Sequence, residues 1–180
     1  MISLAAGNPS PESFPVEEFA ELSAEIFRTE ASKALQYGIT EGYMPLREKV
    51  KNRLKNVFSV GKDGDEVIMT SGGQQGLELA CKVLCNEGDT VLCENPSFIG
   101  ALNAFRSYGV NLVGVDTDGD GMLPESLEKA YAENENVKMV YVIPTFQNPS
   151  GITMSAERRS MLYSFCRDKG IMILEDNPYG

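Results

Sequence analysis

The chain has 180 residues, of which 42% are hydrophobic and 23% are charged, as in an ordinary soluble globular protein. A chain of this length can bury roughly 70% of the surface that its unfolded form exposes, enough for one substantial core. Its net charge of -10 and its scattered basic residues argue against a nucleic-acid partner, because phosphate backbones require clustered Lys and Arg. No apolar run reaches the roughly 18 residues of a membrane span, and the first residues do not resemble a signal peptide. We therefore expect a cytoplasmic protein without a membrane partner.

The chain contains no histidine, which excludes catalysis by a Ser-His or Cys-His pair. Cys81 and Cys85 share a face of an expected helix. Without histidine and without paired C-x-x-C motifs, buried reduced thiols are a better interpretation of the cysteines than a zinc site.

A second possible metal site begins like a calcium-binding loop, with Asp116, Asp118 and Asp120 before Gly121. The twelfth position of that loop should be a bidentate glutamate but is Leu127, and a strand rather than a helix is expected to precede it. We therefore predict no metal site.

The first 60 residues are expected to form an extended segment and a helical arm. Residues 1–15 are rich in turn formers and lack periodicity. Apolar residues then recur at helical spacing over about 16–33 and again over about 45–56, where Pro45 suits the first helical turn.

From Val67 onwards, short apolar runs alternate with helical patterns. The predicted strands are 67–69, 91–93, 110–115, 139–143 and 171–174. The predicted helices are about 74–86, 98–108, 124–134 and 155–169. Two of the runs, 139–143 and 171–174, are continuously apolar, which is typical of strands that helices cover on both faces. The alternation predicts an α/β fold with three layers, α/β/α, around a mostly parallel sheet.

Polar residues gather where the predicted strands end, and ligands of open α/β sheets bind at the carboxyl ends of strands. The run from Thr70 to Gly76 follows the first strand and opens a helix. Gly72 and Gly73 would let the backbone approach an anion such as a phosphate, which the helix N-terminus also favours. Taken alone, the same run is equally well interpreted as a tight strand-to-helix turn, and it matches no nucleotide-binding fingerprint.

Four more residues at strand ends suit a flat aromatic ligand. Phe98 can stack on a ring and Asn148 can donate to a ring oxygen, although in isolation each fits a core aromatic or an Asn-Pro turn. After the last strand, the Asp176 carboxylate can pair with a protonated ring nitrogen, and the Tyr179 phenol can reach a ring hydroxyl. Together they are what a pyridine cofactor such as pyridoxal phosphate requires, apart from its Schiff-base lysine.

Motifs along nearly the whole chain carry a family resemblance. They are Ala5-Ala-Gly-Asn-Pro, Gln36-Tyr-Gly, Gly42-Tyr-Met-Pro-Leu-Arg, Ser71-Gly-Gly-Gln-Gln, Asn95-Pro-Ser-Phe, Gln147-Asn-Pro-Ser-Gly and Asp176-Asn-Pro-Tyr. With them the chain resembles the N-terminal part of a class I/II aminotransferase, a fold-type I pyridoxal-phosphate enzyme. The likeness is strongest to the aminoadipate/kynurenine-type branch of the family. The aminotransferase-like domains of MocR-type regulators share these motifs.

The resemblance implies that the protein binds pyridoxal 5'-phosphate and acts on amino acid and 2-oxo acid substrates. It implies that residues 61–180 form the N-terminal half of the cofactor-binding large domain. By this resemblance, Gly72, Gly73 and Gln74 would bind the phosphate of the cofactor, and Phe98 would stack on its ring. Asn148 and Tyr179 would hydrogen-bond the ring hydroxyl, and Asp176 would pair with the ring nitrogen.

The resemblance further implies a homodimer, in which Tyr37 reaches the phosphate of the neighbouring subunit. Gly7 and Asn148 would line the substrate. In the family, sharp Asn-Pro turns are commonly cis, so we expect cis bonds at Asn95–Pro96 and Asn148–Pro149.

The family's Ser-x-Ser-Lys motif, which carries the Schiff-base lysine, lies downstream of its Asp-x-x-Tyr motif. No lysine of this chain occupies such a position, so we expect no catalytic residue among these residues and an inactive fragment of a transaminase. Three alternatives stay open: a pyridoxal-phosphate lyase of the same fold, the sensor domain of a MocR-type regulator, and a degenerate fragment with only an interaction role.

Overall fold

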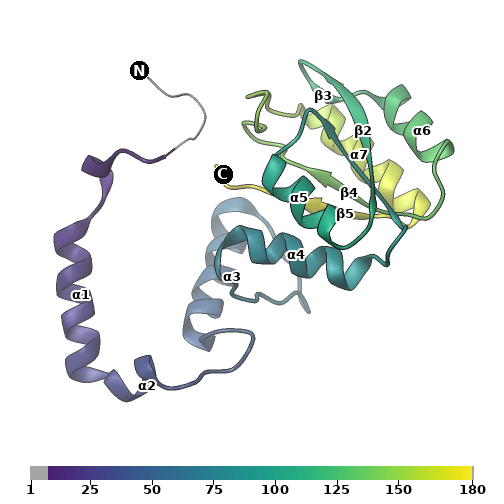
Figure 1. Ribbon diagram of the computed structural model, residues 1–180. Coiled ribbons are helices and arrows are strands. Elements are labelled where there is room, and N and C mark those ends of the chain that lie inside the picture. Colours follow the sequence, from purple (N-terminus) through teal and green to yellow (C-terminus); the bar gives the residue numbers. More distant parts are fainter. Residues whose placement is uncertain (1–7, 180) are drawn as a thin grey trace. The chain divides into compact units, whose positions relative to one another are not determined.

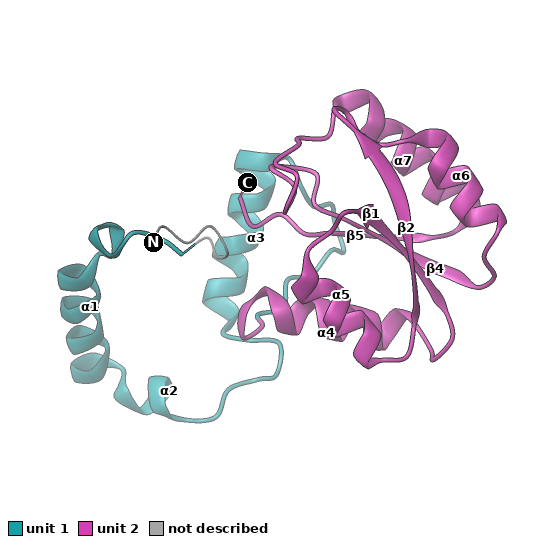
Figure 2. Cartoon of the chain, turned by 45° about the horizontal axis from the view of Figure 1, so that its top comes forward, with its two compact units in different colours: residues 1–69 teal, residues 70–180 magenta. Residues whose placement is uncertain are grey.

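The computed structural model describes residues 8–179, and the chain divides into two compact units, residues 1–69 and 70–180 (Figure 2). The sequence predicted a boundary between residues 60 and 61, whereas the two units of the structure meet between residues 69 and 70. No helix among the described residues is long and apolar enough to cross a membrane.

Unit 1 is helical and buries little of its surface. It contains the 3-10 helix η1 (Pro11–Ser13) and the α-helices α1 (Val16–Thr29), α2 (Ala31–Leu35) and α3 (Met44–Phe58). The predicted helix over 16–33 is therefore interrupted, because Glu30 leaves helical geometry at φ -134° and ψ 24°. Helix α3 confirms the second predicted helix.

The predicted strand at 67–69 is wrong. The segment is irregular, and its hydrogen bonds are isolated ones: the Arg47 guanidinium donates to the Val67 carbonyl, and the Met69 N–H donates to the Glu41 carbonyl at 2.9 Å. Apolar residues make a strand only where a neighbouring strand completes the ladder, and the described part of unit 1 offers none. The close approach of Met69 also explains Gly42, where a Cβ atom would lie 2.6 Å from the methionine side chain.

Unit 2 contains a five-stranded sheet with strand order β3-β2-β1-β4-β5 (Figure 1). The strands are β1 (Thr90–Asn95), β2 (Asn111–Asp118), β3 (Gly121–Met122), β4 (Val137–Val142) and β5 (Met172–Glu175). Pairing is parallel except between β2 and β3, which confirms the prediction of a mostly parallel sheet. The short β3 was not predicted, because two residues carry no detectable alternation.

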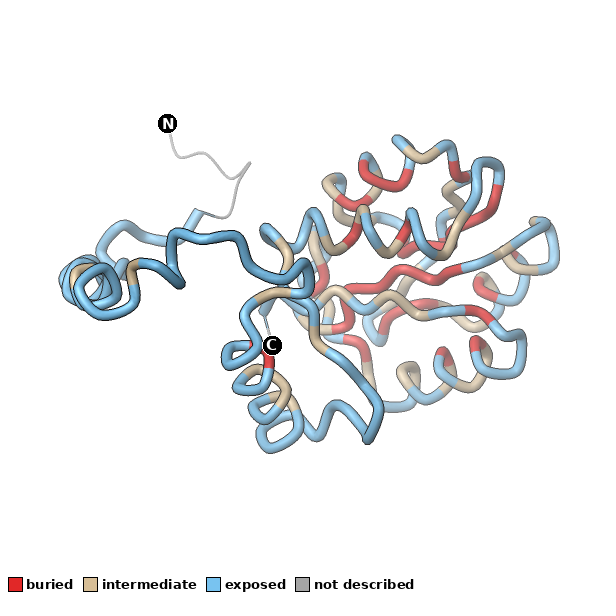
Figure 3. Tube along the Cα trace, turned by 90° about the horizontal axis from the view of Figure 1, so that it is seen from below, coloured by how far each residue is buried: buried red, intermediate tan, exposed pale blue. Residues whose placement is uncertain are grey.

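Helices cover the sheet on both faces, so the three predicted layers are confirmed. Helices α4 (Gly72–Leu84) and α5 (Ile99–Ser107) pack on one face. Helices α6 (Pro124–Ala132) and α7 (Ala156–Lys169) pack on the other. Burial is accordingly concentrated in the strands and in the helix faces turned towards them (Figure 3).

Local chemistry explains where the helices of one layer begin and end. Pro124 stands in the first turn of α6, where a missing N–H costs nothing. The Ser155 hydroxyl accepts a hydrogen bond from the Arg158 N–H at the start of α7. Gly170 ends that helix in the left-handed conformation, with φ 68°.

The acidic loop that resembles a calcium site is a tight connection between β2 and β3. Asp118 accepts the Asp120 N–H at 2.8 Å, and its other oxygen pairs with Arg158, also at 2.8 Å. These hydrogen bonds hold the pKa of the Asp118 carboxyl below its ordinary value. Its carboxylate therefore joins α7 to the β2–β3 turn.

The four cysteines are free thiols, and three of them, Cys81, Cys93 and Cys166, are buried among apolar side chains. Burial raises the pKa of Cys81 to about 12 and that of both Cys93 and Cys166 to about 11. Thiols with such pKa values are poor nucleophiles, which agrees with their interpretation as small hydrophobic side chains.

A matched pair of valine substitutions tests this account of the core. Val140→Ala removes two methyl groups from a fully buried position of β4 and should lower the unfolding free energy by about 2 kcal/mol. Val83→Ala makes the same change on α4, where the side chain is 81% exposed, and should leave stability nearly unchanged. Urea unfolding of the chain measures both. Equal losses would contradict the assignment of the core.

Candidate functional site

Parallel pairing brings three chain segments to one edge of the sheet. Cys93 of β1 lies opposite Tyr141 of β4, and Val142 lies opposite Glu175 of β5. The loops that follow β1, β4 and β5 therefore leave the sheet at the same end. Phe98, Asn148 and Asp176 stand in those three loops, as the sequence predicted.

The start of α4 has free space beside the first N–H groups of the helix. Gly72 is left-handed, with φ 79°, and Cβ atoms added to Gly72 or Gly73 would meet nothing within 4 Å. The capping residue, Ser71, makes no side-chain hydrogen bond to the helix, and the first N–H groups of a helix have no partner within it. This geometry suits a small anion.

Phe98 and Gln74 meet at Gly100, at the start of α5. The Gln74 side-chain amide donates to the Gly100 carbonyl at 3.2 Å. A Cβ on Gly100 would lie 2.5 Å from the Phe98 ring, so glycine is what allows the ring to lie against the helix. The predicted anion loop and the predicted stacking ring are therefore neighbours.

Both Asn-Pro bonds, Asn95–Pro96 and Asn148–Pro149, are cis, which confirms the prediction. The two loops that contain them are joined by Gln147, which is buried. Its side-chain amide donates to the Pro96 carbonyl at 2.8 Å, and its side-chain oxygen accepts the Ser150 N–H at 2.8 Å. Gln147 thus connects the loop that carries Phe98 with the one that carries Asn148.

Asp176 is held by β4 in two ways. Its N–H donates to the Val142 carbonyl at 2.9 Å, and its Oδ2 accepts the Tyr141 hydroxyl at 2.8 Å. Tyr141 is fully buried, and burial, assisted by the Asp176 carboxylate, raises the pKa of its phenol well above the ordinary value. The phenol therefore remains a donor, and Asp176 has a fixed carboxylate. Tyr179, three residues on, is 54% exposed.

Glu94, at the end of β1, is a buried carboxyl that the sequence did not mark. Its Oε2 accepts the Ile143 N–H at 3.0 Å. Burial raises the pKa of Glu94, and the hydrogen bonds from Ile143 and Gln147 oppose that rise only in part. The only available signal was a charged residue between an apolar run and an Asn-Pro turn. No sequence pattern indicated that the buried side chains of Tyr141 and Gln147 would support the candidate site.

Two predicted site residues, Tyr37 and Gly7, do not belong to unit 2. Tyr37 belongs to unit 1, where its side chain is fully exposed and its N–H donates to the Gln36 side chain. Gly7 lies outside the described residues. Their roles stay predictions.

The chain belongs to the aminotransferase class I and II family, whose sequence model matches residues 1–180. It is 41% identical to aromatic-amino-acid aminotransferase 1 of Thermococcus litoralis, over 100% of this chain and 44% of that protein. It is 39% identical to 2-aminoadipate transaminase of Thermus thermophilus, over 99% of this chain and 43% of that protein.

A solved kynurenine aminotransferase of Pyrococcus horikoshii, in complex with PMP, has the same fold. Its TM-score is 0.92 at 39% identity, over 98% of this chain and 45% of that one. These matches confirm the family and fold expected from the motifs. The chain spans less than half the length of each of these relatives.

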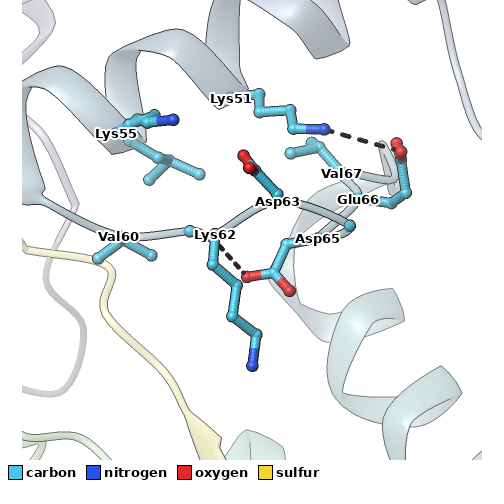
Figure 4. A pocket seen from close by; sticks show the side chains of 11 residues that line it. Lys51, Lys55, Val60, Lys62, Asp63, Asp65, Glu66 and Val67 are labelled. Carbon is cyan, nitrogen blue, oxygen red and sulfur yellow. Dashed lines mark hydrogen bonds and ion pairs between the residues drawn. The ribbon is translucent and has the colours of Figure 1, made fainter.

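A cavity of about 610 Å³ in unit 1 is a separate feature (Figure 4). Its charged lining is balanced, with Lys51, Lys55 and Lys62 against Asp63, Asp65 and Glu66. Lys51 pairs with Glu66 at 3.7 Å, and Asp65 accepts the Lys62 N–H at 3.0 Å. None of the predicted site residues that the structure describes lines it, so we assign it no function.

The raised pKa of Glu94 predicts a pH-dependent effect on stability. The folded state holds this proton more tightly than the unfolded state, whose pKa is near 4.5. The contribution of Glu94 to stability is therefore fully present below that value and is lost as pH rises through the folded pKa. Glu94→Gln cannot titrate but keeps an acceptor for the Ile143 N–H.

The stability of Glu94→Gln relative to the unchanged chain should therefore increase between about pH 4 and about pH 8 in urea unfolding. Glu128→Gln, which removes an exposed carboxylate from α6, measures what the loss of one surface charge does by itself. A relative stability of Glu94→Gln that falls with pH would show that the buried carboxylate stabilises the fold when charged.

Proposed function

We propose that the whole protein is a pyridoxal-phosphate aminotransferase that moves an amino group between an amino acid and a 2-oxo acid. The observation that carries the proposal is the Asp176 carboxylate, held by Tyr141 at the sheet edge that it shares with Phe98 and Asn148. A fixed carboxylate facing the same edge as an aromatic ring and an amide suits a protonated pyridine.

The residues present fit this cofactor. The open space at Gly72 and Gly73 lies at the N-terminus of α4, where the helix leaves its first N–H groups without partners of its own, as a phosphate site requires. The Ser97 hydroxyl, next to Phe98, is buried and has no hydrogen-bond partner among the described residues. Buried hydroxyls are normally paired, so a polar ligand atom at this position would explain it.

When bound, pyridoxal phosphate accepts the amino group and withdraws electrons from the substrate carbon. In this proposal the carboxylate of Asp176 keeps a proton on the ring nitrogen. Asn148 and Tyr179 orient the ring through its hydroxyl oxygen, Phe98 shields one ring face from water, and Gly72, Gly73 and Gln74 hold the phosphate. Proton transfer at the substrate would fall to a lysine, and none of the lysines here matches the family position.

The remaining features of the proposal concern the whole protein. We expect a cytoplasmic homodimer of amino-acid metabolism, in which Tyr37 reaches the neighbouring subunit's phosphate and Gly7 and Asn148 line the substrate. Residues 61–180 would be the first half of the large domain. The relatives' names make aromatic amino acids and 2-aminoadipate the first donors to test.

The direct test supplies the whole protein with pyridoxal 5'-phosphate, one of these donors and 2-oxoglutarate. Chromatography should detect glutamate and the oxo acid derived from the donor in equal amounts. Release of ammonia without glutamate would indicate a lyase instead. Cofactor binding without any turnover would favour a sensor domain.

Asp176→Asn should lower the rate of amino transfer by at least about 100-fold, because the neutral amide cannot keep the ring nitrogen protonated. Asp168→Asn makes the same change at an exposed site on α7, where the carboxylate pairs with Arg167 at 2.8 Å. That control should retain the unchanged rate. Similar rates for the two variants would remove Asp176 from the proposed site.

A further inference from the structure

Tyr141 is the one phenol buried completely within the described sheet. It lies in β4, in the middle of an apolar run, and packs edge-on against Phe105 with ring centroids 5.3 Å apart. Phenylalanine would fill nearly the same volume. Burying a hydroxyl instead is unfavourable unless it is paired, so the hydroxyl needs a reason to be there.

The partner of the hydroxyl is the functional carboxylate. Tyr141 donates to Asp176 Oδ2 at 2.8 Å, while the Asp176 N–H is bound to Val142, the residue after Tyr141. Adjacent residues of β4 therefore hold both the backbone and the side chain of Asp176. With Oδ2 engaged in this way, Oδ1 is the oxygen left for a donor on a ligand.

We propose that Tyr141 is a positioning residue, whose hydroxyl holds the Asp176 carboxylate in place for the protonated nitrogen of the cofactor ring. The inference rests on the proposed function, because it assumes that Asp176 meets such a ring. It adds that recognition of the ring nitrogen depends on a core residue that does not touch the cofactor. Hydrogen-bond partners of this outer kind contribute about 10-fold to 100-fold at metal sites.

The test measures discrimination for the ring nitrogen and not activity. The whole protein, freed of cofactor, is titrated with pyridoxamine 5'-phosphate and with its 1-deaza analogue, in which carbon replaces the ring nitrogen. Calorimetry gives both dissociation constants, and their ratio reports the contact between Asp176 and the nitrogen. Tyr141→Phe should reduce that ratio by about tenfold, mainly by weakening the natural ligand.

Two further variants separate positioning from general damage to the fold. Thr90→Val also removes a buried hydroxyl, which donates to the Glu135 carbonyl at 2.9 Å. Thr90 begins β1, so it lies at the other end of that strand from the candidate site. It should leave the ratio unchanged. Asp176→Asn should abolish most of the discrimination, and adding Tyr141→Phe to it should have no further effect on the ratio.

The outcomes distinguish the two levels of the proposal. If the protein without substitutions binds neither ligand, or binds both with equal affinity, the proposed contact between Asp176 and the ring nitrogen is overturned. Discrimination that is intact in Tyr141→Phe but lost in Asp176→Asn would leave that contact standing and overturn the role of Tyr141. Equal weakening of both ligands by Tyr141→Phe would reduce Tyr141 to a structural residue.

Discussion

The parallel pairing of β4 with β1 on one side and with β5 on the other is the constraint on which the candidate site depends. Parallel strands all point the same way, so the polar loops after them emerge together, although Phe98 and Asp176 are far apart in sequence. An antiparallel neighbour would send its loop to the opposite edge. Among the described strands, that arrangement occurs only at the short β3.

Buried polar side chains then hold the loops of the candidate site at this shared edge. Gln147 joins the two cis-proline loops, Glu94 receives the N–H of Ile143 just before one of them, and Tyr141 holds Asp176. Each of these groups is satisfied inside the fold, where an unpaired polar group would be unfavourable. Rigid support of this kind places ligand-binding side chains more precisely than loops alone do.

The sequence predicted the alternation of strands and helices because its signal is local: apolar runs of strand length separated by helical periodicity. It failed at 67–69, where the run is apolar but pairing, a non-local property, is absent from the described structure. It failed at β3 because two residues are too few for a pattern.

For the candidate site, the placement of Phe98, Asn148 and Asp176 in loops after strands could be predicted, because parallel strands send these loops to one edge of the sheet. Tyr141 and Gln147 could not. Tyr141 is indistinguishable in sequence from any apolar strand residue, and the role of Gln147 depends on a contact with Pro96, 51 positions away. Contacts of this range arise from tertiary packing, which local patterns do not encode.

We propose that this sheet edge holds a pyridine ring with its nitrogen on Asp176. A crystal structure of the whole protein grown with pyridoxamine 5'-phosphate tests it most directly. We expect the ring nitrogen within hydrogen-bond distance of the Asp176 carboxylate, the ring against Phe98, and the phosphate at the N–H groups of Gly73 and Gln74. A ligand bound elsewhere, or bound here with its nitrogen turned away from Asp176, would contradict it.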